Sequence, residues 1–323
     1  MKISWMKQLG YDPLPALLAV NNEAINFFAR RDLMNETPGP VSALWDLPAV
    51  SRLVRKQQPG GFWDYPAKGT LRSETNYNQL ETYRNLGFLV EKFGLNKKHA
   101  TIREAAAFLF SCQSGEGDFR GIYGNQYSPN YSAGIMELLI KAGYGNDPHV
   151  KKGFDWLLSI RQDDGGWAIP LRTRGAKLDS ILESAKTLEP DRTRPFSHLV
   201  TGVVLRAFAA HPRYRCTAAA KKGARLLSSR FFQKDKYTDR GAPEFWGRCA
   251  FPFWFTDIVS SLDSLSRLSS SAKEPEIANA LKWLVAKQEP DGLFGLKLLK
   301  TGDRDLNYWL CLAICRIFKR FYA

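Results

Sequence analysis

The chain has 323 residues, of which 44% are hydrophobic and 13% aromatic, so it is not a disordered sequence and can bury a large core. Lysine and arginine number 46 against 32 aspartate and glutamate, and the net charge of +14 attracts anionic partners. The longest apolar runs, such as Leu14–Val20, are far shorter than the roughly 20 residues that span a bilayer. The first residues lack the apolar core of an export signal, and we expect a cytoplasmic protein.

Apolar residues recur with the period of an α-helix along most of the chain, and no convincing stretch alternates as a strand does. The pattern therefore predicts an all-α fold. The stretch 172–195 interrupts it: this stretch is charged and holds only a weak helix at Leu178–Ser184. Such an insertion is either a lid over a binding site or a disordered loop. The predicted helices are Leu14–Asp32, Val41–Gln58, Asn78–Lys92, Lys98–Gln113, Pro129–Ala142, Pro148–Gln162, Phe196–His211, Thr217–Phe232, Phe253–Ser269, Pro275–Gln288 and Asp303–Phe321.

Helices of two kinds alternate from Val41 onward. One kind carries charged residues on one face, as in Lys151–Arg161, whereas the other is apolar nearly all round, as in Leu199–Ala209. A helix that is apolar on nearly every side is buried on nearly every side. Alternating outer and inner helices predict an α/α toroid of repeated hairpins around a central axis. We expect residues 41–323 to form the toroid and residues 1–40 to pack on it as an N-terminal helical segment.

A phrase of glutamine, glycine and an aromatic residue follows four of the amphipathic segments. Glycine can end a helix in the left-handed conformation, and a glutamine amide can bond the carbonyls that this leaves or the start of a neighbouring helix. We therefore interpret these residues as staples between helical hairpins rather than as ligands. The copies are Gln58–Trp63, Gln113–Phe119, Gln162–Trp167 and Gln288–Phe294, with a degenerate copy expected near residue 225.

These phrases resemble the QW repeats of the squalene–hopene cyclase and protein prenyltransferase superfamily, whose terpenoid cyclase-like members form α/α toroids around a lipophilic pocket. A closer resemblance is to short prokaryotic prenyltransferase-like proteins of unassigned function. Together the resemblances cover about residues 41–321, with one further match near the start. The residues that carry them are Phe154–Trp167, Ala280–Gly292, Ala105–Gln113, Lys222–Gln233, Asp12–Leu18, Asn146–Lys151 and Phe251–Asp257.

The activity of these families does not carry over with the fold. The cyclases protonate their substrate with an Asp-x-Asp-Asp motif, and the nearest string here is Asp303-Arg-Asp305. The prenyltransferases hold zinc through an aspartate, a cysteine and a histidine, and Cys249 and Asp257 lack the sequence around that site. The five cysteines form no CxxC pair and are interpreted as small buried hydrophobes. We expect no metal or cofactor, and whether the chain is an enzyme stays open.

Polar and aromatic side chains gather at the starts of the inner helices, where they would reach a ligand in a central cavity. Tyr77, Tyr131, Trp254 and Tyr308 would form an aromatic ring suited to an isoprenoid, unless they fill the axis as core. The expected binding residues are Tyr77, Asn78, Tyr131, Glu137, His198, Trp254 and Tyr308, with His198 alternatively a core histidine.

Two carboxylates on the inner helices, Asp257 and Glu81, are candidate general acids. The first functional hypothesis is a protein that binds a hydrophobic, isoprenoid small molecule. The second is a carbohydrate-active enzyme, which needs two carboxylates about 5–9.5 Å apart, with Glu137 as a further partner. The third is a non-catalytic scaffold with a basic outer surface. Basic pairs are spread along the chain, which argues against a nucleic-acid interface and leaves peripheral membrane contact open.

Overall fold

The computed structural model describes residues 4–67, 72, 75–177, 181, 186–237, 241–268, 270–299 and 302–322. The chain divides into two compact units: Met1–Pro40 with Arg213–Ala323 form unit 1, and Val41–Pro212 form unit 2. Helices build both units, and the paired strands found among the described residues are only two residues long. The predicted all-α fold class is confirmed.

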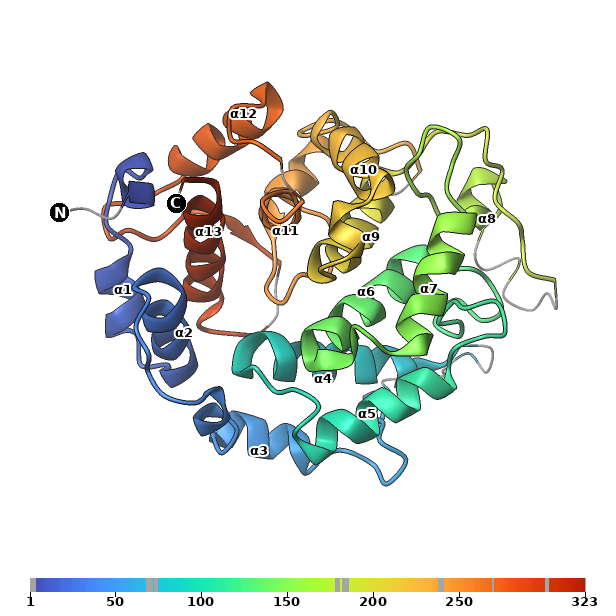
Figure 1. Ribbon diagram of the computed structural model, residues 1–323, viewed down its shortest axis with the longest axis horizontal. Coiled ribbons are helices and arrows are strands. Elements are labelled where there is room, and N and C mark those ends of the chain that lie inside the picture. Colours follow the sequence, from blue (N-terminus) through green and yellow to red (C-terminus); the bar gives the residue numbers. More distant parts are fainter. Residues whose placement is uncertain are drawn as a thin grey trace. The chain divides into compact units, whose positions relative to one another are not determined.

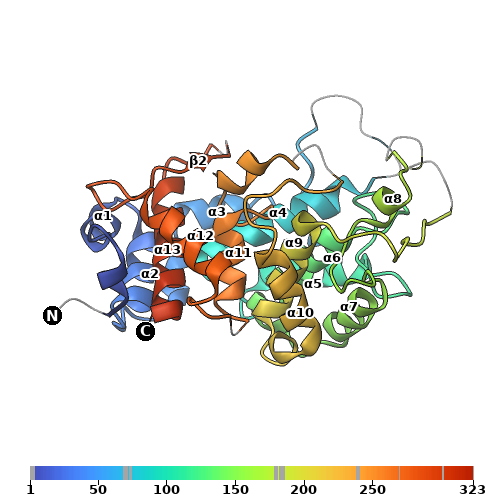
Figure 2. The same cartoon turned by 90° about the horizontal axis from the view of Figure 1, so that it is seen from above.

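Unit 1 is centred on the long helix α13 (Leu306–Tyr322), which packs against α1 (Leu14–Ala19), α2 (Glu23–Leu33) and α11 (Ile258–Leu265), as Figure 1 shows. Strand β1 (Arg248–Cys249) pairs in parallel with β2 (Lys297–Leu298), which is labelled in Figure 2. The unit also holds α10 (Ala218–Ser228), α12 (Pro275–Val285) and the 3-10 helices Ser4–Gln8, Tyr214–Cys216 and Pro243–Gly247.

Unit 2 alternates amphipathic helices with more deeply buried ones. Its most extensive helix pair is α6 (Pro129–Leu139) against α9 (His198–Ala210), which lie side by side in Figure 1. Every residue of α6 except Asn130 and Tyr131 is buried, as its apolar sequence predicts. The other elements are α3 (Pro48–Val54), α4 (Tyr77–Phe93), α5 (Ala100–Ser111), α7 (Pro148–Ser159), α8 (Pro170–Thr173), the 3-10 helix Val41–Leu44 and the π-helix Ile140–Tyr144.

The predicted helices are found, most of them shorter than the apolar pattern suggested. The expected helix Leu14–Asp32 is two helices, because the Asn22 side chain accepts a hydrogen bond from the Ile25 backbone N–H and starts α2 anew. The expected helix Val41–Gln58 begins as α3 only at Pro48, a residue suited to the first helical position. The weak helix expected over residues 178–184 lies, except for residue 181, outside the described residues.

Candidate functional site

The repeated glutamine–glycine–aromatic phrases link neighbouring helices through side-chain hydrogen bonds. The Gln113 amide donates one 2.8 Å hydrogen bond to the Gly117 carbonyl and another to the carbonyl of His149, in the first turn of α7. Gly117 has a φ of +115°, which an L side chain rarely adopts. The same pair of bonds recurs from Gln57 to Gly61 and Thr101, and from Gln288 to Gly292 and Tyr11.

For two of the phrases, the residue that bonds the glycine carbonyl lies one position before the predicted glutamine, Gln58 or Gln162. The residue that bonds the glycine carbonyl lies four positions before the glycine, so Gln57 holds this place in the first copy and Gln58 does not. In the third copy the place belongs to Arg161, whose guanidinium donates to the Gly165 carbonyl at 2.9 Å. Gln162 instead donates to the carbonyls of two residues of the insertion, Asp191 and Arg194.

The aromatic residue of each of the first three phrases is tied to the next buried helix. The backbone N–H of Trp167 donates to the Thr201 hydroxyl of α9 at 2.9 Å, and the ring is fully buried. Its indole N–H also donates to the Leu157 carbonyl at 2.7 Å. The interpretation as staples between hairpins is therefore confirmed for the aromatic residues of these three phrases. The equivalent backbone bonds join Trp63 to Thr82 of α4 and Phe119 to Ser132 of α6.

Three predicted site residues, Tyr77, Asn78 and Glu81, lie together in the first turns of α4. The Tyr77 ring is 5.0 Å from the ring of Tyr65, and the Asn78 side-chain oxygen accepts the Tyr65 backbone N–H at 3.1 Å. Glu81 accepts a 3.1 Å hydrogen bond from the amide of Asn85. All three predicted residues are half-buried, so this end of α4 combines aromatic surface with satisfied polar groups.

Tyr131, at the start of α6, belongs to a cluster of three tyrosines. Its ring meets the rings of Tyr123 and Tyr83 edge-on, at centroid distances of 5.3 and 6.1 Å. Tyr83 comes from the second turn of α4, so the cluster joins α4 to the start of α6 within unit 2. We call Tyr83, Tyr123 and Tyr131 the tyrosine cluster.

Glu137 and His198 are both deeply buried. The Glu137 carboxylate pairs with Arg206 of α9 at 2.8 Å and with Lys141 at 2.7 Å, so both of its oxygens are engaged. His198 is the first residue of α9 and is 3% exposed. Glu137 therefore joins α6 to α9, while His198 is a buried residue at the start of α9.

Three predicted site residues, Trp254, Asp257 and Tyr308, belong to unit 1. Asp257 is the N-cap of α11: its carboxylate accepts the Ser260 backbone N–H at 2.8 Å, and its own N–H donates to the Ser260 hydroxyl at 2.9 Å. This reciprocal capping box stabilises the start of the helix. Trp254 lies just before α11 and Tyr308 in the first turn of α13, and both are half-buried.

Sequence reasoning missed a group of buried polar residues beside the tyrosine cluster. Gln79 and Ser128 are both fully buried, one in the first turn of α4 and the other just before α6. Neither residue type stands out in the apolar pattern. Only the absence of a hydrogen-bond partner for their side chains within the described part of the chain marks them.

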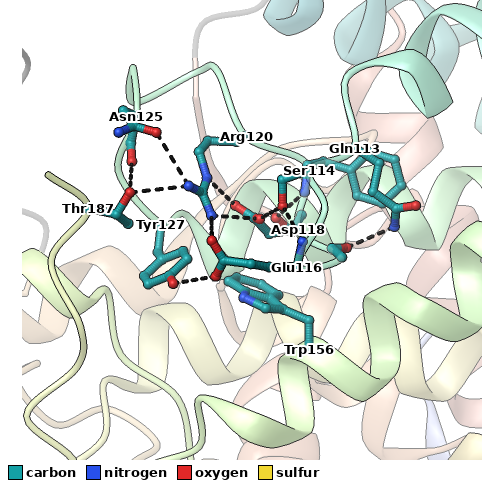
Figure 3. Close-up of polar contacts among 12 residues, drawn as sticks. Gln113, Ser114, Glu116, Asp118, Arg120, Asn125, Tyr127, Trp156 and Thr187 are labelled. Carbon is teal, nitrogen blue, oxygen red and sulfur yellow. Dashed lines mark hydrogen bonds and ion pairs between the residues drawn. The ribbon is translucent and has the colours of Figure 1, made fainter. Parts of the chain in front are cut away.

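A second polar cluster anchors the insertion at 172–195. Figure 3 shows Arg120 at its centre, bonded to Glu116 at 2.8 Å, to Asp118 at 3.0 Å and to the Thr187 hydroxyl at 3.1 Å. The Tyr127 hydroxyl contacts the carboxylates of Glu116 and of Glu189, the latter at 2.9 Å. The described part of the insertion is therefore fixed to the loop that precedes α6 rather than free.

The anchoring cluster should loosen in acid. Burial raises the pKa of Glu116, but hydrogen bonds from Tyr127 and Arg120 more than offset this and hold that pKa below its usual value. A carboxylate with a lowered folded-state pKa contributes stability above its unfolded pKa of about 4.3, and this contribution is lost as pH falls through the folded-state value. Hydrogen–deuterium exchange, corrected for intrinsic rate, should therefore show constant protection of residues 186–194 near neutrality and a loss of protection below about pH 4.3.

Glu116→Gln removes the titrating group and is the matched control, which should show weak protection of these residues at every pH. Circular dichroism at each pH separates local release from global unfolding. Wild-type protection that persists to acid pH would contradict the role of Glu116.

The cysteines and acidic residues do not assemble a metal centre in the part of the chain that the structure describes. Burial raises the pKa of the Cys249 and Cys315 thiols, which suits the predicted small hydrophobes. Cys216 differs from that prediction because it is exposed, in a short 3-10 helix. Over the same described residues, each helix is too short or too polar to cross a membrane.

Comparison with known proteins gives a short sequence match and a broad, weak structural likeness. No protein-family model matches the chain. A squalene-hopene cyclase from Schizosaccharomyces japonicus is 38% identical over 58 residues, which are 18% of this chain and 9% of that protein. A crystal structure of a protein from Actinoplanes has 16% identity and a TM-score of 0.42, over 87% of each chain.

A variant of the type II terpene cyclase MstE from Scytonema, in complex with geranylgeranyl dihydroxybenzoate, has 13% identity and a TM-score of 0.41. That alignment covers 87% of this chain and 97% of the cyclase. The sequence match to squalene-hopene cyclase confirms the resemblance to the terpenoid cyclase-like superfamily that the repeated phrases of this chain predict.

Proposed function

We propose that the chain is a cyclase- or prenyltransferase-like protein that binds a hydrophobic, isoprenoid small molecule. The observation that carries the proposal is the tyrosine cluster between α4 and the start of α6, where Tyr123 and Tyr131 are half-buried aromatic side chains. Aromatic rings offer a large apolar surface at low entropic cost, and their faces attract cations. The sequence match to a squalene-hopene cyclase supports an isoprenoid as the apolar ligand.

The same proposal extends to the other expected contacts. Within unit 2, Tyr77 and Asn78 would contact the ligand beside the cluster, on α4. The glutamine phrases would be QW repeats in the sense of the superfamily, within an α/α toroid. These assignments follow from the sequence pattern and are proposals to be tested with the ligand.

The proposal is limited to binding, because the candidate acids already have other roles. The Asp257 carboxylate caps α11, a position at which serine, threonine and asparagine also serve. The Glu81 carboxylate pairs with Arg84 at 3.4 Å and accepts a hydrogen bond from Asn85. Glu137, considered for glycoside chemistry, uses both oxygens for Arg206 and Lys141. The isoprenoid proposal therefore fits the contacts better than the carbohydrate alternative does.

Farnesol binding to the purified full-length protein, measured by quenching of intrinsic fluorescence, tests the proposal. We expect saturable binding by the wild type and about tenfold weaker binding by Tyr131→Ala, since one aromatic contact contributes on the order of 1 kcal/mol beyond its buried area. Tyr144→Ala is the matched control: Tyr144 is also half-buried in unit 2 but packs on Phe110, outside the cluster, and its loss should leave affinity unchanged. A wild type that binds neither farnesol nor the hydrocarbon farnesene would refute the proposed function.

A further inference from the structure

The buried side chain of Gln79 has unmet hydrogen-bonding capacity. It is 0% exposed, and neither its amide oxygen nor its amide nitrogen has a partner among the described residues. The oxygen lies against the turn at Gly121, where an added Cβ would come within 2.6 Å of it. Buried polar groups in native proteins are almost always paired with protein or with ordered solvent, so an unpaired amide marks a place where another group binds.

Two further side chains with the same property lie at the start of α6. Ser128 occupies the N-cap position and is 0% exposed, yet its hydroxyl makes no capping bond and has no partner in the described structure. The side-chain oxygen of Asn130, two residues on, likewise has none there. Two neighbouring polar side chains at the start of α6 thus lack a hydrogen-bond partner among the described residues, as Gln79 does on α4.

The tyrosine cluster brings these two helix starts together. Gln79 and Tyr83 are four residues apart and so lie on one face of α4. The Tyr83 ring is 6.1 Å from the ring of Tyr131, which directly follows Asn130 in the chain. Gly121, which contacts Gln79, begins the stretch of chain that leads to Ser128. The unpaired polar groups therefore collect at the α4–α6 junction, beside the aromatic surface proposed for the ligand.

Gln126 shows that the same loop can satisfy a buried glutamine. It is 1% exposed, its amide nitrogen donates to the Lys186 carbonyl at 3.0 Å, and its oxygen accepts the Leu188 backbone N–H at 3.0 Å. Gln79 and Gln126 are thus two buried glutamines of unit 2 that differ in whether the protein itself pairs them. The difference makes Gln126 the matched control for Gln79.

We propose that Gln79, Ser128 and Asn130 form a binding site for a neutral hydroxyl group at the starts of α4 and α6. The site offers a donor in the Gln79 amide nitrogen, acceptors in the Gln79 and Asn130 oxygens, and a serine hydroxyl that does both. An O–H group both donates and accepts, whereas a carboxylate only accepts and an ammonium only donates. The hydroxyl is that of an internal water molecule or that of a bound prenyl alcohol, and the second source rests on the proposed function.

Gln79→Met in the full chain removes both polar atoms at nearly constant length and separates the two sources. If a prenyl alcohol is held, the variant binds farnesol at least about tenfold more weakly, as expected for loss of a good hydrogen bond, and binds farnesene unchanged. If an internal water is held, farnesol affinity is unchanged and the Tm falls, because the water loses its partner. Gln126→Met should lower the Tm and leave the ratio of farnesol to farnesene affinity unchanged.

A rise in the Tm of Gln79→Met with unchanged farnesol affinity overturns the inference. If no group binds the Gln79 amide, its burial destabilises the native state. Its removal in Gln79→Met would for that reason stabilise the protein. A wild type that binds neither farnesol nor farnesene removes only the proposed function. In that case the direction of the Tm change in Gln79→Met still decides whether the site holds a water hydroxyl.

Discussion

Replacing Arg206 by methionine is expected to lower the free energy of unfolding by about 3 kcal/mol, the lower end of the cost of breaking a buried ion pair, because Lys141 still pairs with Glu137. The Arg206 side chain is 2% exposed and its guanidinium is 2.8 Å from the Glu137 carboxylate, across the α6–α9 contact. Burial raises the pKa of Glu137, but Arg206 and Lys141 more than offset this and keep that pKa below its usual value. Methionine keeps much of the volume of arginine, so the loss reports on charge more than on packing.

The double variant Arg206→Met with Glu137→Met should recover most of that loss, since an apolar pair of similar volume often replaces a buried ion pair without cost. Urea unfolding followed by circular dichroism gives both free energies. Arg84→Met is the control, because Arg84 pairs with Glu81 on the exposed side of α4 and should contribute less than about 1 kcal/mol. Equal, small losses for Arg206→Met and Arg84→Met would show that the buried pair does not hold α6 to α9.

The positions of the helices could be predicted from the sequence because burial and helix period follow the same residues. α6 and α9 are apolar nearly all round and are buried nearly all round. The helix boundaries were less accurate, since a single side chain decides them. Asn22 divides the first predicted helix, and the pattern of apolar residues does not register a cap.

The contacts of the candidate site depended on pairings that the sequence does not specify. The spacing between a glutamine and its glycine distinguishes Gln57 from Gln58, but the two glycines that follow Gln58 left the register ambiguous. Glu137 is a predicted ligand contact because polar residues on the inner helices would line a central cavity. Its partner Arg206 lies on another helix, in an equally apolar segment, so the sequence does not indicate the pairing.

The repeated phrase that predicted the fold therefore explains how helical hairpins are held together and not the chemistry of the chain. Its glycine and aromatic residues are buried where two hairpins pack together, as Trp167 illustrates. The starts of the buried helices are not part of the phrase, so their residues can differ. The residues that make those starts distinctive, Gln79 and the tyrosine cluster, lie outside the phrase. A functional difference among proteins with this repeat should thus be sought at the first turns of the buried helices.

Gly117→Ala is expected to cost about 1–3 kcal/mol more than Gly39→Ala, the price of forcing extra atoms into a packed seam. The two glycines have similar positive φ values, +115° and +106°, so the strain of a positive φ is common to both variants. At Gly117 an added Cβ would lie 2.6 Å from the Lys152 carbonyl of α7, whereas at Gly39 no atom lies within 4 Å. Because the obstacle is backbone, α7 itself must move away from the phrase that holds it, and the Gln113 bond to His149 should weaken with it. Urea unfolding of both variants measures the difference, and equal losses would show that the close approach of the two hairpins at Gly117 does not contribute to stability.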